Sequence, residues 1–291
     1  MQSLHLLQSS DSCRLAYVRW NEGGRHPMLF CHGTPGSRLF RPAEPTLLSE
    51  IDVDLVTVDR LGYGQSTAQP GRTLLDWPRD VAALADELGW QHFAVAGISG
   101  GGPHALACGR TMPERVTAVG VISGVAPFWP GAVQGMLVTT RQAFWLARWG
   151  PWLLVLAAGR LKSNRDHYLV KLRHELPVCD RQIVDRDDVQ AVLADNYAES
   201  VAAREMGHEM IQLRHACGFV RSEVQVPVWL RHGERDRNVP VAHAHRMAAA
   251  LPDCHMPSLP APVTTSSSTN GARSFPSLLR TTEELRVSWS G

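Results

Sequence analysis

The chain has 291 residues, and its 29 Lys and Arg residues nearly balance its 28 Asp and Glu residues, which leaves a formal net charge of +1. With 44% hydrophobic and 20% charged residues, the composition is typical of a folded protein that is long enough to bury a large core. The balanced charge argues against nucleic acid or an acidic molecule as the partner.

The N-terminus and the cysteines bear on the compartment. Residues 1–11 contain no basic region followed by an apolar run, so we expect no secretory signal. The six cysteines, at positions 13, 31, 108, 179, 217 and 254, show no spacing typical of a metal site, and most stand among apolar residues. We interpret them as buried free thiols of a cytoplasmic protein, and we expect no metal or other cofactor.

Strand and helix patterns alternate over the first 125 residues. Apolar runs predict strands at 13–20, 27–31, 53–58, 92–96 and 116–122. The segments 42–50, 75–88 and 103–110 are compatible with helices, the second of them with a clear apolar face. Continuous apolar strands that alternate with helices indicate an α/β fold with a mostly parallel sheet and right-handed crossovers.

Strand patterns disappear between Ala126 and about Glu223. The segments 133–149, 152–161, 187–203 and 203–217 are predicted to be helical, and a strand pattern resumes at 226–230. We therefore expect a helical insertion over 126–223, placed between an N-terminal core part (1–125) and a C-terminal core part (224–254). The apolar run 152–158 is too short to span a bilayer.

Three predicted strands end in polar, glycine-rich loops, at 32–37, 59–66 and 97–101. Because ligands bind outside the carboxyl ends of strands in open parallel sheets, these loops are expected to converge at one edge. The third loop reads Gly-Ile-Ser-Gly-Gly and places Ser99 at the apex of a strand–turn–helix. A serine at such a tight turn is strained and exposed at a helix N-terminus, so Ser99 is the candidate nucleophile.

Four motifs together resemble those of the α/β-hydrolase fold family. They are His32–Gly36, Asp59–Ser66, the turn around Ser99, and Gly233–Pro240, in the family's order over residues 12–254. The resemblance implies the family's fold, with 126–223 as its helical cap. It also implies hydrolysis of an ester, lactone, amide or thioester through an acyl-serine intermediate, without a cofactor.

The resemblance assigns an oxyanion hole beside Ser99. One donor would be the amide of Gly100, directly after the nucleophile, and the other the amide of Thr34 in the first loop. Pro35 has no N–H to give. His32 is expected to be structural rather than a base.

The resemblance also assigns the acid. Asp236 would accept the N–H of a catalytic histidine and fix its tautomer. Glu234 and Asp253 are rivals, but only Asp236 has the family's spacing in its motif. Asp59 and Arg60 are expected to pin neighbouring loops and carry no catalytic assignment.

The histidine that should follow Asp236 does not stand where the family has it. His243 and His245 fall in a predicted helix over 241–251 and are expected to face away, while His255 comes at the start of the last strand, too early for the loop after it. Residues 255–291 are rich in Pro, Ser and Thr, and they predict an unstructured tail in place of the last strand and helix.

The codons of residues 257–276, read one base earlier, can encode Ala-Leu-Pro-Ala-Gly-Ala-Gly-His-Tyr-Phe-Phe-Ile-Asp-Gln-Trp-Arg-Glu-Ile-Phe-Pro. This alternative resembles the family's ending, with its histidine across the codons of Val263 and Thr264. We hypothesise that the chain from about residue 255 is translated out of frame, which would remove the general base and impair activity.

Two classes of function stay open. The first is a serine hydrolase of a small apolar substrate, since the dehalogenases and epoxide hydrolases of the resembled family carry Asp at the turn. The second is a non-catalytic binding protein of the same fold or an inactive gene product. Tryptophans 129, 145, 149 and 152 either line an apolar substrate cavity or pack between cap helices. A metal-dependent hydrolase is disfavoured because His243-x-His245 and His208–Glu209 lack a third ligand at a recognisable spacing.

Overall fold

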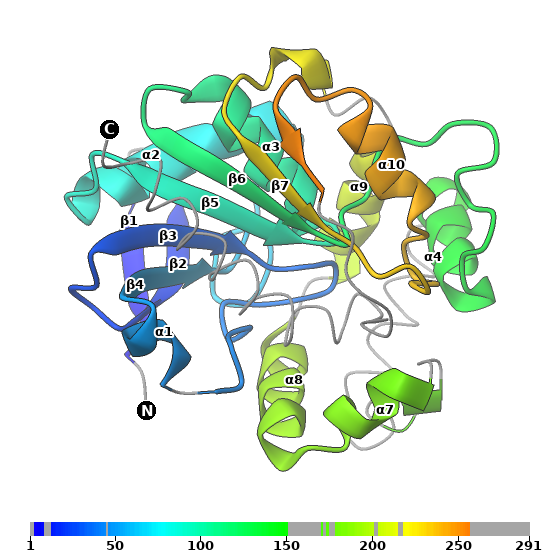
Figure 1. Cartoon of the computed structure of the whole chain (residues 1–291), viewed down its shortest axis with the longest axis horizontal. Helices are drawn as coiled ribbons and strands as arrows, with labels where there is room; N and C mark the ends of the chain where they lie inside the picture. Colours follow the sequence, from blue (N-terminus) through cyan, green and yellow to red (C-terminus); the bar gives the residue numbers. More distant parts are fainter. Residues whose placement is uncertain are drawn as a thin grey trace.

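The computed structural model describes residues 3–8, 13–44, 46–150, 170, 173–174, 178–200, 203–214 and 218–256. In this part of the chain the strands form one eight-stranded sheet in the order β1-β2-β4-β3-β5-β6-β7-β8 (Figure 1). The strands are β1 (His5–Gln8), β2 (Arg14–Trp20), β3 (His26–Cys31), β4 (Val53–Val58), β5 (Phe93–Ile98), β6 (Val116–Ile122), β7 (Val228–Arg231) and β8 (Cys254–His255).

The sheet is parallel from β4 to β8, and β1 and β2 join it in antiparallel pairs. Cys31, the last residue of β3, is paired with both Val58 and Gly97, near or at the ends of β4 and β5. Ile122 at the end of β6 is paired with Ile98 and Arg231. The loops after β3, β4 and β5 therefore leave the sheet at one edge, as the sequence predicts, and the loops after β6 and β7 leave it at the same edge.

Alternate side chains of the strands fill two apolar cores. Leu29, Val56 and Val95 face a core closed by α2 (Trp77–Glu87) and α3 (Gly101–Thr111). Phe30, Leu55 and Ala96 face the other core, closed by α1 (Leu47–Glu50). This burial on both faces is why the strands read as continuous apolar runs.

The expected strands over 13–20, 27–31, 53–58, 92–96, 116–122 and 226–230 are all present, within two residues at each end. The strand β1 was not expected, because its residues are mostly exposed and form no apolar run. The expected helix over 42–50 is a single turn, α1, that begins after Thr46. Pro42 and Pro45 precede that turn, and proline cannot supply the N–H that a longer helix needs.

Between β6 and β7 the described residues contain helices and no strand. They are α4 (Val138–Trp149), α7 (Val178–Val184), α8 (Asp187–Glu199), α9 (Ala203–Arg214) and the short 3-10 turn η2 (Arg221–Glu223). Another 3-10 turn, η1 (Leu74–Asp76), precedes α2, and α10 (Ala242–Ala248) follows β7. The predicted helix over 152–161 lies outside the described residues, and the division at 126 and 223 stays a prediction.

The chain after Asp236 re-enters the sheet. β8 pairs only Cys254 and His255, with Val228 and Trp229 of β7. The last strand, which the sequence predicts to be missing, is therefore present over these two residues. Met256, directly after it, packs against the core. The folded chain thus continues slightly past the predicted start of the tail at 255, whereas residues 257–291, with the proposed change of frame, lie outside the described residues. Among the described helices, none is both long and apolar enough to cross a membrane.

Candidate active site

Ser99 stands at a strained turn between β5 and α3. Its φ is +52°, in the left-handed region that costs a non-glycine residue energy. A Cβ on Gly97 would lie 2.9 Å from the amide nitrogen of Gly102, and one on Gly101 would lie 2.5 Å from the carbonyl oxygen of His32. Both are backbone atoms that cannot move aside, so the turn requires glycine at these two positions, as the sequence predicts.

The peptide unit between Ser99 and Gly100 is fixed through its carbonyl. Ser99 O accepts hydrogen bonds from the amides of Gly102 (3.1 Å) and Val125 (3.4 Å). Because a trans peptide unit is planar, its N–H points opposite to its carbonyl. The amide of Gly100, the first expected oxyanion donor, is thereby directed away from these two bonds at the start of α3.

The peptide unit between Gly33 and Thr34 is fixed in the same way. Gly33 O accepts hydrogen bonds from His32 Nδ1 (2.7 Å) and Arg60 Nη2 (3.0 Å). This loop lies against the turn, since a Cβ on Gly33 would lie 3.4 Å from Ser99 Cβ. The structure thus brings together Ser99, Gly100 and Thr34, the residues expected to hold the nucleophile and the oxyanion.

His32 serves the backbone of these loops. Its Nε2 accepts a hydrogen bond from the amide of Arg60 at 3.1 Å, which leaves the ring proton on Nδ1 for Gly33 O. Burial, and then the charge of Arg60, hold the pKa of His32 well below its usual range, so the ring is neutral. This agrees with the expectation that His32 is structural.

Asp59 pins the same loops. Its carboxylate accepts hydrogen bonds from the amides of Arg38 (2.7 Å) and Gln65 (2.9 Å) and pairs with the Arg38 guanidinium at 2.7 Å. Burial raises its pKa, opposed by these partners. Arg60 pins Gly33, as described above, so both residues have the expected structural roles.

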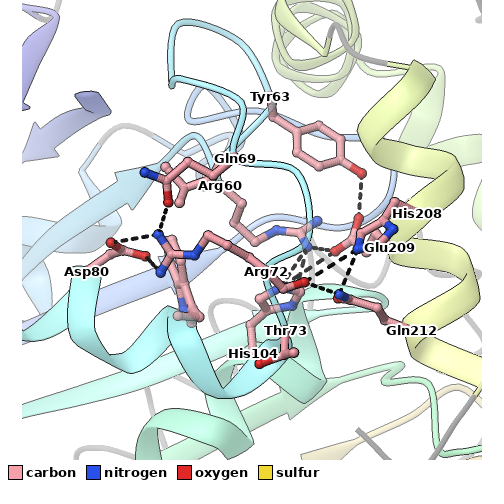
Figure 2. Close-up of a pocket in the computed structure, with 12 residues that line it drawn as sticks. Arg60, Tyr63, Gln69, Arg72, Thr73, Asp80, His104, His208, Glu209 and Gln212 are labelled. Atoms are coloured by element: carbon pink, nitrogen blue, oxygen red, sulfur yellow. Dashed lines mark hydrogen bonds and ion pairs between the residues drawn. The ribbon is translucent and has the colours of Figure 1, made fainter. Parts of the chain in front are cut away.

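Glu209 of α9 joins this site from the helical segment. Its Oε2 accepts a hydrogen bond from Thr34 Oγ1 at 2.8 Å. The same oxygen accepts a hydrogen bond from the hydroxyl of Tyr63, and Oε1 forms an ion pair with Arg60 (Figure 2). His104 Nε2 lies 3.8 Å from the same oxygen. The sequence offered one signal for this residue: Glu209 is a lone carboxylate between Met206, Met210 and Leu213, on the face of α9 that is buried.

Asp236 lies in the loop after β7, where the fold requires the acid. It is buried, and its Oδ1 accepts hydrogen bonds from the amides of Asn238 (2.8 Å) and Val239 (3.0 Å). Its Oδ2 lies 4.0 Å from Nε2 of His232, which donates to Val239 O at 2.7 Å. Burial lowers the pKa of His232 to about 4, so the ring is neutral and committed to the loop.

The rival carboxylates lie elsewhere. Glu234 is exposed, and Asp253 pairs with His255 at 3.0 Å. Of the three carboxylates, only Asp236 is buried. Its loop follows β7, which lies next to β6, and β6 lies next to β5, the strand that ends at the turn of Ser99.

The three histidines that follow Asp236 in the sequence, His243, His245 and His255, all lie within the described part of the chain. His243 is buried with both ring nitrogens bonded to backbone, to the amide of Ala126 and the carbonyl of Ala132. His245 is exposed on α10, and His255 stacks on Trp229. In the described part of the chain, these contacts identify none of the three histidines as the base for Ser99.

A family model described as alpha/beta hydrolase fold matches residues 26–158, which include the first loop and the turn at Ser99. That match spans less than half of the chain, and together with the sheet it shows that the chain has the α/β-hydrolase fold. This agrees with the sheet order, the strained serine and the position of Asp236 after β7. A fold hosts many chemistries, so the fold alone does not fix the reaction.

Individual relatives of this α/β-hydrolase-fold protein match over part of their length. It is 31% identical to the uncharacterized hydrolase YcgS of Bacillus subtilis over 103 residues, 35% of this chain and 36% of that protein. It is 31% identical to haloalkane dehalogenase 2 of Mycobacterium tuberculosis over 135 residues, 45% of each chain. The match thus spans less than half the length of these two relatives. The enol-lactonase structure from Burkholderia xenovorans LB400 has a TM-score of 0.69 at 17% identity, covering 97% of this chain and 100% of the other, and shows the fold.

A polar pocket of this α/β-hydrolase-fold protein lies beside α9 (Figure 2). Its charged groups are paired with one another: Arg72 with Asp80 at 2.5 Å, and Arg60 with Glu209. Ser99 and Asp236 are not among its lining residues, so this pocket is not the expected apolar substrate cavity. The lining residues are Arg60, Leu61, Tyr63, Gln69, Arg72, Thr73, Trp77, Asp80, His104, His208, Glu209 and Gln212.

The expectation for the tryptophans needs correction. Trp145 and Trp149 of α4 are 59% and 68% exposed, so they do not pack between cap helices. Trp129 is half-buried against His243, with ring centroids 4.7 Å apart. Trp152 lies outside the described residues. Over the described ranges, no group of three or more His, Cys, Asp or Glu side chains is arranged to hold a metal ion.

Proposed function

We propose that this protein is a serine hydrolase that cleaves an ester, lactone, amide or thioester of a small apolar substrate through an acyl-Ser99 intermediate. The observation that carries the proposal is the strained Ser99, at φ +52°, beside the amides of Gly100 and Thr34. Hydrogen bonds to the carbonyls of Ser99 and Gly33 fix both peptide planes before any substrate binds. Donors fixed in advance stabilise a developing oxyanion without reorganisation.

In the proposed reaction, Ser99 Oγ attacks the acyl carbon and its proton passes to a base. The carbonyl oxygen becomes the oxyanion at the amides of Gly100 and Thr34, and the leaving group departs with a proton. Water then attacks the acyl-serine and releases the acid. Asp236 would orient the base and stabilise its charged form.

The activity that we propose for this chain is limited by the general base, which none of the three described histidines after Asp236 clearly supplies. Losing a triad member costs about 10⁴–10⁶ in kcat, while the oxyanion hole and binding retain roughly 10³–10⁴ over the reaction in water. Since His243, His245 and His255 are committed elsewhere or exposed, we propose slow turnover for the chain as printed. The same observation favours a second candidate, a non-catalytic protein of this fold that binds a small molecule.

Similarity to a haloalkane dehalogenase raises a different chemistry. By the resemblance noted above, the family's dehalogenases carry Asp at the turn, whereas this chain carries Ser99. We therefore propose acyl transfer rather than displacement of a halide.

Cysteine chemistry supports our proposal that the protein works in the cytoplasm. Cys31 and Cys108 are buried free thiols. Burial raises the pKa of Cys31 to about 12, which keeps that thiol protonated and unreactive. Unpaired thiols are typical of a reducing compartment.

The experiment is labelling with a fluorophosphonate probe, together with turnover of p-nitrophenyl esters. The hydrolase proposal expects slow labelling of the wild type, none of Ser99→Ala, and slow ester turnover that the same substitution abolishes. If the folded wild type shows neither labelling nor turnover, the hydrolase proposal is wrong for this chain and the binding protein is favoured.

A further inference from the structure

We propose that Arg60 and Glu209 form a positioning pair for the oxyanion hole, through which α9 sets the direction of the Thr34 amide. For its catalytic consequence the proposal rests on the proposed function. Its structural half concerns only the Gly33–Thr34 peptide unit, and is tested separately. Glu209 belongs to the helical segment between β6 and β7, whereas Arg60 and Thr34 belong to loops of the sheet edge.

The first step is the geometry of one peptide unit. Gly33 C=O and Thr34 N–H share a plane and point in opposite directions. Arg60 Nη2, at 3.0 Å, and His32 Nδ1, at 2.7 Å, both hold the carbonyl end. Turning this peptide unit over would require breaking both bonds, so the two donors determine where the Thr34 amide points.

The second step is the charge of Arg60. Its side chain is 3% exposed, and burial lowers its pKa. A buried guanidinium needs a counter-charge, because removing one partner of a buried ion pair leaves a charge that is costly to desolvate. Glu209 is the one carboxylate that forms an ion pair with Arg60 among the described residues. Glu209 thus stabilises the guanidinium at its position against Gly33.

The third step is a direct contact. Glu209 Oε2 accepts a hydrogen bond from Thr34 Oγ1 at 2.8 Å, so the carboxylate holds the side chain of the residue whose amide is at issue. The hydroxyl of Tyr63 donates to the same oxygen, and the Arg60 guanidinium lies 5.0 Å from the Tyr63 ring centroid. In Figure 2, Glu209 projects from α9 into this group. The Thr34 amide is therefore held from the carbonyl before it and from its own side chain.

A purely structural role would not need this arrangement. Buried ion pairs are often replaced by apolar residues without loss of stability. Here the pair is bonded to both residues of one peptide unit, next to the serine. A charged donor on Gly33 O also polarises that unit, which makes the Thr34 N–H a stronger donor.

The experiment compares Glu209→Ala, Glu209→Gln, Thr34→Val, Thr34→Ser and the double variant Glu209→Ala/Thr34→Val with the wild type. The first measurement is amide hydrogen exchange in a peptide that spans Gly33–Ser37, which needs no activity. We expect exchange there to rise about tenfold or more in Glu209→Ala, and less in Glu209→Gln, which keeps an acceptor for Thr34. Exchange in β5 and α3 should not change. Gln212→Ala is the control, because Gln212 is on the same helix but bonds His208 and Arg72 O.

The second measurement is the rate of Ser99 labelling, with kcat and KM for p-nitrophenyl acetate. We expect Glu209→Ala to lower the labelling rate and kcat by about 10–10²-fold, which is less than the loss of a whole oxyanion donor because the Thr34 amide is displaced rather than removed, with KM within about twofold. Thr34→Ser should retain the wild-type rates, whereas Thr34→Val should lose them. The double variant should lose no more than the worse single variant, because both changes remove the same contact.

Each outcome decides the proposal. Unchanged exchange over 33–37 in Glu209→Ala overturns it, whatever the rates are. Where the wild type is active, two further results for Glu209→Ala overturn the proposal: faster exchange with an unchanged labelling rate and kcat, or a change confined to KM. In either case the pair would be structural only. If the wild type is inactive, the proposed function fails, and exchange alone judges whether the pair holds the amide. If Glu209→Ala does not fold, Glu209→Gln, which is close in size, supplies the comparison.

Discussion

Nδ1 of His243 accepts a hydrogen bond from the amide of Ala126 at 3.1 Å. The other ring nitrogen, Nε2, donates to Ala132 O at 3.0 Å, so the ring joins α10 to the chain that leaves β6. Burial lowers the pKa of His243, and the two bonds suit only the neutral ring with its proton on Nε2. A ring used in this way has no nitrogen left to accept the proton of Ser99.

The first prediction follows from these two bonds. His243→Ala should lower the free energy of unfolding by about 2–4 kcal/mol, because it leaves buried backbone groups unpaired and opens a cavity. His245→Ala, on the same helix but exposed, should change it by less than about 0.5 kcal/mol. Urea unfolding followed by tryptophan fluorescence measures both. Equal effects would contradict the structural assignment of His243.

The second prediction concerns pH. Burial is the first cause that lowers the pKa values of His32, His104, His232 and His243 below their unfolded value of about 6.5. Below that value the unfolded chain binds protons that the folded chain does not, so the free energy of unfolding should fall as the pH drops from 7.5 to 5. Each such histidine adds a slope of at most about 1.4 kcal/mol per pH unit.

The control for this slope is a single histidine. His243→Gln should make the slope shallower than in the wild type, because it removes one histidine whose pKa burial lowers. Comparing variants in this way cancels the carboxyl groups that titrate at lower pH. A slope that His243→Gln does not alter would mean that His243 is not held neutral.

The third prediction concerns the turn at Ser99. Gly101→Ala should prevent folding or cost more than about 3 kcal/mol, because its Cβ would meet the backbone oxygen of His32. Gly89→Ala should cost only about 1 kcal/mol, because Gly89 has a positive φ (+72°) but open space around it. Thermal unfolding of both variants measures the difference. Similar losses would mean that the turn is not closely packed.

The fourth prediction separates two roles of Asp236. Asp236→Ala should cost about 2–4 kcal/mol, because the amides of Asn238 and Val239 would lose their charged acceptor. Asp236→Asn keeps an acceptor and should cost less, while it still removes the charge that a base would need. Glu234→Ala is the matched control in the same loop and should cost less than about 0.5 kcal/mol. Loss of labelling in a stable Asp236→Asn variant would support the catalytic role, and unchanged labelling would argue against it.

The sequence predicts the parts of this fold that local chemistry determines. Gly97 and Gly101 flank Ser99 because no side chain fits there, and that need is visible as a pattern. Glu209 is different, because its role depends on where α9 meets the loops of Arg60 and Thr34, at a sequence separation of 175 residues from Thr34. The strand β1 was missed because its exposed residues carry no apolar pattern. Contacts between distant segments are what the sequence alone does not display.

The fifth prediction concerns the tail, which lies outside the described residues. Replacing residues 257–276 by the sequence of the alternative frame would add a histidine after the strand that begins at Cys254. This strand, β8, pairs with β7, and the loop after β7 carries Asp236. The added histidine would lie in the segment after β8. We expect p-nitrophenyl ester turnover to rise by about 10³-fold or more, since a base completes the triad. The same tail with its histidine changed to alanine should fold as well but show no rise. If the histidine tail folds and turnover does not increase, the hypothesis of a displaced reading frame is wrong, and an in-frame gene without this alternative would contradict it independently.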